Sequence, residues 1–182
     1  MNSIQKINFK NKKVLIRVDF NVPLDDGLKV TDDTRIRAAK PTILKVLKDG
    51  GCCVLMSHLG RPSFQDPQFS LVHIVNKLVS VLGINVLFSD QCVGEAPTQL
   101  AKTLRPGQVL LLENLRYHKE ETTGGLEFAK QLSSLADFYI NDAFGTAHRA
   151  HASTTVVAQF FPNAKCFGFL LANILRSLSQ IS

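Results

Sequence analysis

The chain has 182 residues, of which 45% are hydrophobic and 20% charged, which is typical of one folded domain and excludes disordered, collagen-like and coiled-coil chains. No apolar run approaches the roughly 18 residues of a membrane-spanning helix, and the first residues lack a signal-peptide core, so we expect a cytoplasmic protein. The 21 Lys and Arg residues outnumber the 15 Asp and Glu residues, giving a net charge of +6. This surplus favours an anionic partner without choosing between nucleic acid, a membrane surface and small phosphorylated molecules.

In chain order, the first half contains a strand, a helix, a second strand and a second helix. Asp32 or Thr31 is expected to cap the first helix, and Pro41 is expected to break or restart it. The second helix has apolar residues at helical spacing and ends before Gly83. The ranges of the four elements are Lys13–Val18, 33–48, Cys52–Ser57 and Ser70–Leu82.

The second half continues the alternation, and its strands, like the earlier ones, are continuous apolar runs. Such runs favour a parallel sheet covered on both faces. The sequence therefore predicts a doubly wound, Rossmann-like α/β domain with a mainly parallel sheet of about six strands and helices on both faces. The ranges are the strands Asn85–Phe88, Gln108–Glu113 and Asp137–Asn141, the helices Gly94–Leu104 and Gly125–Leu135, and the weaker strands Thr154–Gln159 and Ala164–Gly168.

The last predicted helix, Phe169–Ser182, carries one apolar stripe that must be covered, either by the domain's own body or by a partner. The four cysteines include no C-x-x-C pair, and we interpret them as core thiols in a reducing compartment. The adjacent Cys52 and Cys53 are expected to face opposite sides of one strand.

Basic side chains follow the ends of the predicted strands, where parallel sheets bind ligands. A lone arginine in a loop is usually a solvated charge, Arg17 suits a structural ion pair, and Asp142 suits a loop held by hydrogen bonds. The combination is less ordinary, because converging like charges repel unless an anion joins them, and arginine binds phosphate or carboxylate through paired hydrogen bonds. The sequence therefore predicts a site for a small polyanion. The residues expected to converge are His58, Arg61, Arg116, Arg149 and, in support, His148 and His151.

Several common site motifs are absent from the sequence. It has no G-x-x-x-x-G-K-[S/T] or G-x-G-x-x-G phosphate cradle, no zinc-ligand spacing and no G-x-S-x-G nucleophile. We therefore expect no metal site and no nucleotide site on this chain. A nucleic-acid site is disfavoured because it would spread its charges along a stripe with interleaved aromatic residues.

At these loops the sequence resembles phosphoglycerate kinase, specifically its N-terminal domain. The matching segments occur in the family's order and spacing and cover about residues 4–171. They are Val14–Pro23 (VLIRVDFNVP), Thr34–Ala39 (TRIRAA), Met56–Pro62 (MSHLGRP), Leu112–His118 (LENLRYH) and Asn141–His151 (NDAFGTAHRAH).

The resemblance implies phosphoryl transfer between 1,3-bisphosphoglycerate and ADP, giving 3-phosphoglycerate and ATP. It assigns to this domain the glycerate substrate, which a basic patch binds, and it makes Arg35 the catalytic residue beside the transferred group. Such transfer needs positive charge on the phosphoryl oxygens, and the acceptor carboxylate is already ionised at pH 7. The implied substrate-binding residues are Asp19, Phe20, Asn21, Arg35, His58, Leu59, Gly60, Arg61, Arg116 and Arg149, with His148 and His151 supporting the patch.

The family's second half, which the resemblance implies would bind Mg-ATP or Mg-ADP, is not recognisable here. We expect residues 1–171 to form the substrate domain and residues 172–182 a diverged or truncated tail helix without carboxylate side chains. A frameshift, a truncated gene, a fragment with a changed end and a diverged paralogue remain open as origins of this tail. The expected protein is a monomer that binds 3-phosphoglycerate and needs a nucleotide-binding domain for turnover. The alternative is a stand-alone, non-catalytic phosphoglycerate-binding module.

Overall fold

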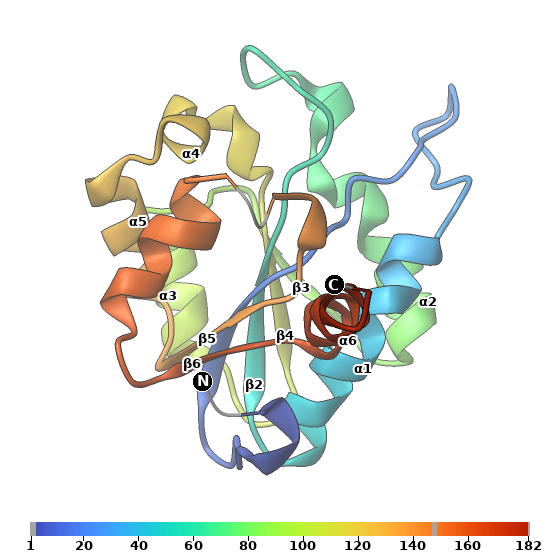
Figure 1. Ribbon diagram of the computed structural model, residues 1–182. Helices are drawn as coiled ribbons and strands as arrows, with labels where there is room; N and C mark the ends of the chain where they lie inside the picture. The colour runs from blue at the N-terminus through green and yellow to red at the C-terminus, as the bar shows by residue number, and fades with distance from the viewer. Residues whose placement is uncertain (1–2, 147–148, 182) are drawn as a thin grey trace.

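A six-stranded parallel sheet crosses the middle of the molecule in the computed structural model, which describes residues 3–146 and 149–181 (Figure 1). The strand order is β3-β4-β2-β1-β5-β6, and every pairing is parallel. The α/β fold with a parallel sheet of about six strands is thus confirmed. The strands are β1 (Lys13–Arg17), β2 (Cys52–Met56), β3 (Leu87–Ser89), β4 (Val109–Leu112), β5 (Phe138–Asn141) and β6 (Lys165–Phe167).

Helices cover both faces of this sheet, with α1, α2 and α6 on one side and α3, α4 and α5 on the other (Figure 1). None of the helices in the described part of the chain is long and apolar enough to span a membrane. The α-helices are α1 (Thr34–Lys48), α2 (Val75–Leu82), α3 (Glu95–Thr103), α4 (Lys119–Thr123), α5 (Leu126–Ser133) and α6 (Phe169–Ser179). Short 3-10 turns lie at Ile4–Lys6, Pro67–Phe69, Leu71–Ile74, Leu115–Tyr117, Phe144–Thr146 and Val157–Phe160, and a π-helical turn at Ala152–Val156.

The continuous apolar strands supply two separate cores, one on each face. In β1, Val14 and Ile16 belong to the core under α1 and α2, whereas Leu15 belongs to the core under α3 and α5. Cys52 and Cys53 are divided between the same two cores, as their adjacency in a strand predicts. Both faces of the sheet are therefore covered by apolar side chains, so polar residues can gather only at the ends of the strands.

Two sequence-based expectations about secondary structure were wrong. Thr154–Gln159 is not a strand, because this segment lies in the π-helical and 3-10 turns between β5 and β6. Its Val and Thr content favours a strand locally, but its side chains pack against α5 instead. Pro41 does not break its helix either, because α1 continues through it with Pro41 on the exposed side. The N-cap residue of this helix is Asp33 rather than the expected Asp32 or Thr31, and its side chain makes no cap hydrogen bond. The Asp32 carboxylate, one position earlier, accepts hydrogen bonds from the backbone and hydroxyl of Thr34.

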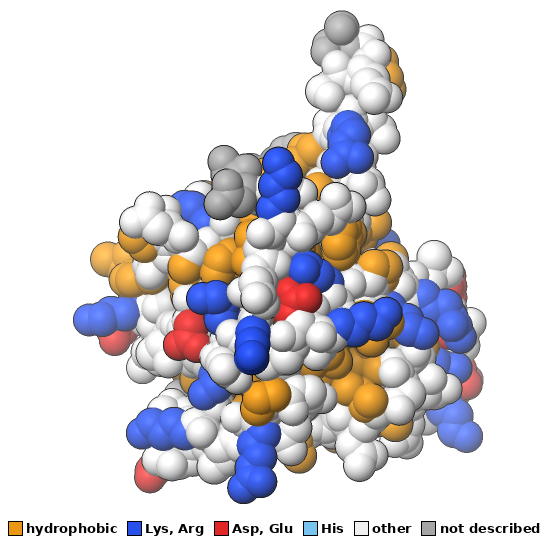
Figure 2. All heavy atoms as spheres, turned by 90° about the horizontal axis from the view of Figure 1, so that it is seen from below, with side chains coloured by type: hydrophobic (Ala, Val, Ile, Leu, Met, Phe, Trp, Pro, Cys, Tyr) orange, Lys and Arg blue, Asp and Glu red, His pale blue; other side chains and the backbone are white. Residues whose placement is uncertain are grey.

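The apolar stripe that begins in α6 is only partly covered. Only Leu171 is buried, whereas Leu178 is 50% exposed and Ile181 is 82% exposed. Figure 2 shows the helix projecting from the body of the molecule, so the domain covers the beginning of the stripe and not its end. The boundary expected between residues 1–171 and 172–182 falls inside this single helix.

Candidate functional site

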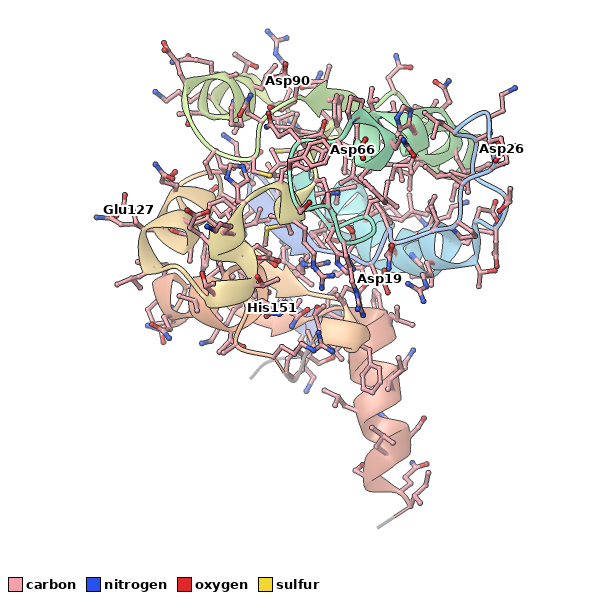
Figure 3. The ribbon with its side chains drawn as sticks, turned by 90° about the horizontal axis from the view of Figure 1, so that it is seen from above. Asp19, Asp26, Asp66, Asp90, Glu127 and His151 are labelled. Atoms are coloured by element: carbon pink, nitrogen blue, oxygen red, sulfur yellow. The ribbon has the colours of Figure 1, made fainter. Side chains whose placement is uncertain are left out.

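A pocket of about 180 Å³ opens at the carboxyl ends of β1, β2 and β5, where the sequence analysis expected a ligand. Each wall comes from a different strand–helix connection, and Arg35 enters from the first turn of α1. Figure 3 views this end of the molecule, with Asp19 and His151 toward its centre and Asp26, Asp90 and Glu127 toward its rim. The lining residues are Arg17, Asp19, Asn21, Arg35, His58, Arg61, Arg116, Ala143, Gly145, Thr146 and Arg149.

The charge of this pocket is strongly unbalanced, because five arginines and one carboxylate, Asp19, line it. The guanidinium of Arg35 lies 3.3 Å from the Asp19 carboxylate and donates a 2.9 Å hydrogen bond to the Asn21 carbonyl oxygen. Arg61 and Arg149 form no ion pair with any carboxylate in the described ranges. Burial lowers the pKa of Arg116, and the neighbouring charge of Arg17 lowers it further. The pocket is therefore prepared for negative charge that the protein itself does not supply.

Arg17 is a residue of the pocket that the sequence analysis assigned to a structural ion pair instead. Its side chain is 1% exposed and lies 3.9 Å from the Glu121 carboxylate, so the ion pair exists. Its Nε donates a 2.8 Å hydrogen bond to the hydroxyl of Ser153, which itself donates to Glu121 at 2.5 Å. The available signal was a charged residue inside the apolar run of β1, which indicates a buried charge that must be paired.

His58 lies beside Arg17 and is only 7% exposed. An Nη2 of Arg17 lies 2.9 Å from the Nδ1 of His58. Burial, and next the charge of Arg17, lowers the pKa of His58 to about 2. The imidazole is therefore neutral at physiological pH, so it adds a polar group to the pocket and not a positive charge.

Three of the expected binding residues, Phe20, Leu59 and Gly60, do not line the arginine pocket. Phe20 and Leu59 are buried in the core, and the side chain of Asn21 accepts a 2.9 Å hydrogen bond from the backbone of Gly60. Leu59 and Gly60 line a neighbouring cavity of about 560 Å³ that shares Asn21 with the pocket. The backbone of Phe20 donates to the Ser57 hydroxyl at 2.9 Å, which fixes the turn after β1.

A second cavity, of about 390 Å³, extends the arginine pocket past Arg61, Arg116 and Arg149. His151 lines this cavity and not the arginine pocket, and its buried Nδ1 has no hydrogen-bond partner within the described residues. His148, the other supporting histidine, lies outside the described residues. Of the two histidines expected to support the patch, the structure therefore describes only His151, which borders this cavity and not the arginine pocket.

Asp142 holds the loop after β5, as expected, and does not line the pocket. One of its carboxylate oxygens accepts a 3.2 Å hydrogen bond from the backbone of Leu171, in the first turn of α6. Burial raises the pKa of Asp142 to about 6, against hydrogen bonds that lower it. Gly168 passes so close that a Cβ there would lie 2.2 Å from the Cγ of Asp142.

Parallel α/β topology defines the chain as a Rossmann-like domain, and an arginine-lined pocket lies at its strand ends, where such domains bind their ligands. Comparison with known proteins identifies the family, because the family model described as phosphoglycerate kinase matches residues 4–182. The chain belongs to the phosphoglycerate kinase family.

Individual relatives agree with the family match. The cytosolic phosphoglycerate kinase of Triticum aestivum and the chloroplastic phosphoglycerate kinase 1 of Arabidopsis thaliana are each 51% identical over 178 residues, or 98% of this chain. The crystal structure of phosphoglycerate kinase from Pyrococcus horikoshii OT3 superposes with a TM-score of 0.88 at 32% identity, over 99% of this chain and 45% of that one. The chain spans about half the length of these relatives, or less: 44% of the first and 37% of the second.

Proposed function

We propose that this chain is the 3-phosphoglycerate-binding half of a phosphoglycerate kinase, and that residues 1–171 carry the substrate site. The observation that carries the proposal is the convergence of five arginines on one pocket that contains a single carboxylate. 3-phosphoglycerate has a carboxylate at one end and a phosphate at the other, so it can satisfy several guanidinium groups at once. The family membership supplies the substrate class, and the pocket supplies its charge complement.

The proposed roles follow the sequence assignments and the position of each residue. Arg61, Arg116 and Arg149, which have no carboxylate partner in the described ranges, bind the phosphate that is not transferred. Asp19 and Asn21 hold the hydroxyl and carboxylate end, with Phe20, His58, Leu59 and Gly60 completing the cradle through backbone or neutral groups. Arg35, which is 53% exposed at the mouth of the pocket, meets the phosphoryl group as it moves to or from the substrate carboxylate.

The Mg-nucleotide that the family membership implies does not fit this pocket. Within the described residues no three His, Cys, Asp or Glu side chains are grouped so as to hold a metal ion, and guanidinium groups repel cations. We therefore assign the nucleotide to a second domain and derive no step through it. This chain orients the glycerate substrate and places positive charge near the transferred group, and turnover requires the second substrate in the same closed site.

Titration calorimetry of the chain with 3-phosphoglycerate tests the proposal, with glycerate as the ligand control that lacks phosphate. We expect one saturable site for 3-phosphoglycerate and much weaker binding of glycerate, because the phosphate contacts are lost. Absence of heat with 3-phosphoglycerate, or equal binding of both ligands, contradicts the proposal.

A coupled kinase assay then separates an enzyme half from a stand-alone binding module. The chain alone should show little or no turnover, and a separately produced nucleotide-binding domain of a relative should restore some. Binding without restored turnover favours the non-catalytic module, and normal turnover by the chain alone contradicts the division of the site. We also propose a cytoplasmic, monomeric protein that binds neither nucleic acid nor membrane, which light scattering and salt-dependent binding assays can test.

A further inference from the structure

The hydrogen bonds around Arg17 determine the protonation pattern of His58. A guanidinium group has only donors, so the contact of 2.9 Å between an Nη2 of Arg17 and the Nδ1 of His58 requires Nδ1 to accept. An accepting Nδ1 carries no hydrogen. Burial, and next the charges of Arg17 and Arg116, lower the pKa of His58, so the ring gains no second proton. The single ring hydrogen must therefore lie on Nε2.

The Nε2 of His58 is available to a ligand. No hydrogen bond joins it to another described residue, and it does not belong to the fully buried polar atoms that lack a partner. His58 lines the arginine pocket. A hydrogen on Nε2 is thus an uncharged donor at the wall of a site that five guanidinium groups also line.

Arg17 is itself held in place by Ser153 and Glu121, which do not line the pocket. Its Nε donates to the Ser153 hydroxyl at 2.8 Å, Ser153 donates to Glu121 at 2.5 Å, and Glu121 also accepts from the Ser153 backbone at 2.9 Å. Another N–H of Arg17 donates to the carbonyl oxygen of Val18. Arg17, Glu121 and Ser153 are all fully buried, so the guanidinium has one orientation and its charge is compensated away from the pocket.

We propose that Arg17 is a positioning residue for the substrate site: held by Glu121 and Ser153, it fixes His58 as the neutral tautomer with hydrogen on Nε2, which donates to the bound anion. The chain Glu121–Ser153–Arg17–His58 orients the ring before the ligand arrives. This inference rests on the proposed function for the identity of the anion, but the tautomer is a property of the free chain. It also explains why a histidine, and not a sixth cation, stands at this position among five arginines.

Long-range 15N–1H correlation spectra of the histidine rings test the tautomer in the complete, unliganded chain. The His58 signals are assigned by their loss in His58→Gln, and His73, a partly exposed histidine outside the pocket, serves as the internal reference. We expect hydrogen on Nε2 alone from pH 5.5 to 8. Hydrogen on Nδ1, or an imidazolium in this range, overturns the proposal.

Removing the guanidinium tests the role of Arg17. Arg17→Met alone leaves Glu121 buried without its partner and can unfold the chain, so the paired variant Arg17→Met/Glu121→Gln removes both charges together. We expect His58 in this variant to become a mixture of tautomers, with a pKa that returns toward 6.5. Ser153→Ala keeps both charges and should broaden the His58 signals. An unchanged tautomer in the folded paired variant shows that Arg17 does not fix it.

Addition of 3-phosphoglycerate tests the donation itself. The Nε2 hydrogen of His58 should shift on binding, whereas the signals of His73 should not. His58→Gln can accept from Arg17 and donate to the ligand, so it should retain binding better than His58→Lys, which cannot accept, by about tenfold. Binding that leaves the Nε2 signal unmoved overturns the donation. Absence of all binding contradicts the proposed function, while the tautomer and the Arg17 variants still decide the positioning role.

Discussion

Burial divides the arginines of the pocket into two groups with different effects when they are removed. The side chain of Arg17 is 1% exposed and belongs to a buried network, whereas that of Arg35 is 53% exposed at the mouth of the pocket. Loss of a buried charge partner destabilises the fold, but loss of an exposed cation changes only binding or rate. Site variants are therefore informative at Arg35, Arg61 and Arg149.

Arg35→Ala should remove most of the turnover of this chain when it is combined with a nucleotide-binding domain, with a smaller effect on the KM for 3-phosphoglycerate. The reason is that charge on the moving phosphoryl group matters most in the transition state. Steady-state kinetics measure both kcat and the KM for 3-phosphoglycerate. Arg37→Ala is the matched control, because Arg37 lies on the same helix and pairs with Asp33 outside the pocket. Normal turnover by Arg35→Ala would show that this assignment is wrong.

Arg61→Ala or Arg149→Ala should weaken 3-phosphoglycerate binding by about 1.5–3 kcal/mol for each lost charged hydrogen bond. Neither residue has a carboxylate partner in the described ranges, so no compensating gain is expected. Calorimetry of each variant measures the loss. Arg176→Ala, on the exposed side of α6, changes the net charge equally and should leave the affinity nearly unchanged. An equal loss in all three variants would indicate a general charge effect instead of a site.

Most residues that the sequence could assign lie in loops after strands, because strand order places their side chains at one edge. Arg35, on α1, was assigned through the family resemblance instead. Arg17 escaped this reasoning because it belongs to the strand itself, and only the three-dimensional packing of Ser153 and Glu121 reveals its partners. The neutral state of His58 was also out of reach, since it depends on burial and on a guanidinium 41 positions away in the chain.

At the scale of elements, helix α1 contains Pro41 in its interior, where a proline normally costs stability. Pro41 leaves the carbonyl oxygen of Arg37 without its helical hydrogen bond. Pro41→Ala should therefore raise the free energy of unfolding by about 1–2 kcal/mol, the helix gain being partly offset by the greater freedom of the unfolded chain. Urea unfolding measures the change, and Lys40→Ala, with nearly the same helix propensity, is the control. A loss of stability in Pro41→Ala would show that the ring makes favourable contacts that exceed its cost.

The two ends of α6 should differ in their contribution to stability. Leu171→Ala removes a fully buried side chain and should cost about 2–5 kcal/mol. Leu178→Ala removes a side chain that is 50% exposed and should change stability by less than about 0.5 kcal/mol. Chemical unfolding of both variants gives the comparison. Equal losses would mean that the end of the stripe is covered in solution.

Most elements were predictable because the strands are short continuous apolar runs, whereas the helices carry apolar residues at helical spacing. The failures occurred where local pattern and packing disagree. Thr154–Gln159 has the composition of a strand, but the sheet already has its six members and the segment instead covers α5. The stripe of α6 predicts a covered face, but the structure covers only its beginning, because a pattern alone does not say which part of it has a partner.

For the whole molecule, the side chains with shifted pKa values predict how the free energy of unfolding depends on pH. Burial lowers the pKa of His58 from 6.5 to about 2, and it also lowers the pKa of His118 and His151. The unfolded chain then binds more protons below pH 6.5, so stability present above that pH is lost as the pH falls. Asp142 acts in the opposite direction, because its raised pKa of about 6 makes stability fall as the pH rises from 3.8 to 6.

Urea unfolding between pH 4.5 and 7.5 should therefore give a free energy that rises with pH, with His58 contributing about 1.4 kcal/mol between pH 5.5 and neutrality. His58→Gln should flatten this profile. Asp142→Asn should steepen it, because the opposing titration is removed. A profile that His58→Gln leaves unchanged would show that this histidine is not buried in its neutral form.

The contact between Gly168 and Asp142 links two positions that are 26 residues apart. No side chain fits at position 168 while the Asp142 carboxylate stays where it receives the first turn of α6. A side chain at position 168 would displace the Asp142 carboxylate, which belongs to the loop whose Ala143, Gly145 and Thr146 line the arginine pocket. We therefore expect a side chain at position 168 to be tolerated only where position 142 carries a smaller residue than Asp.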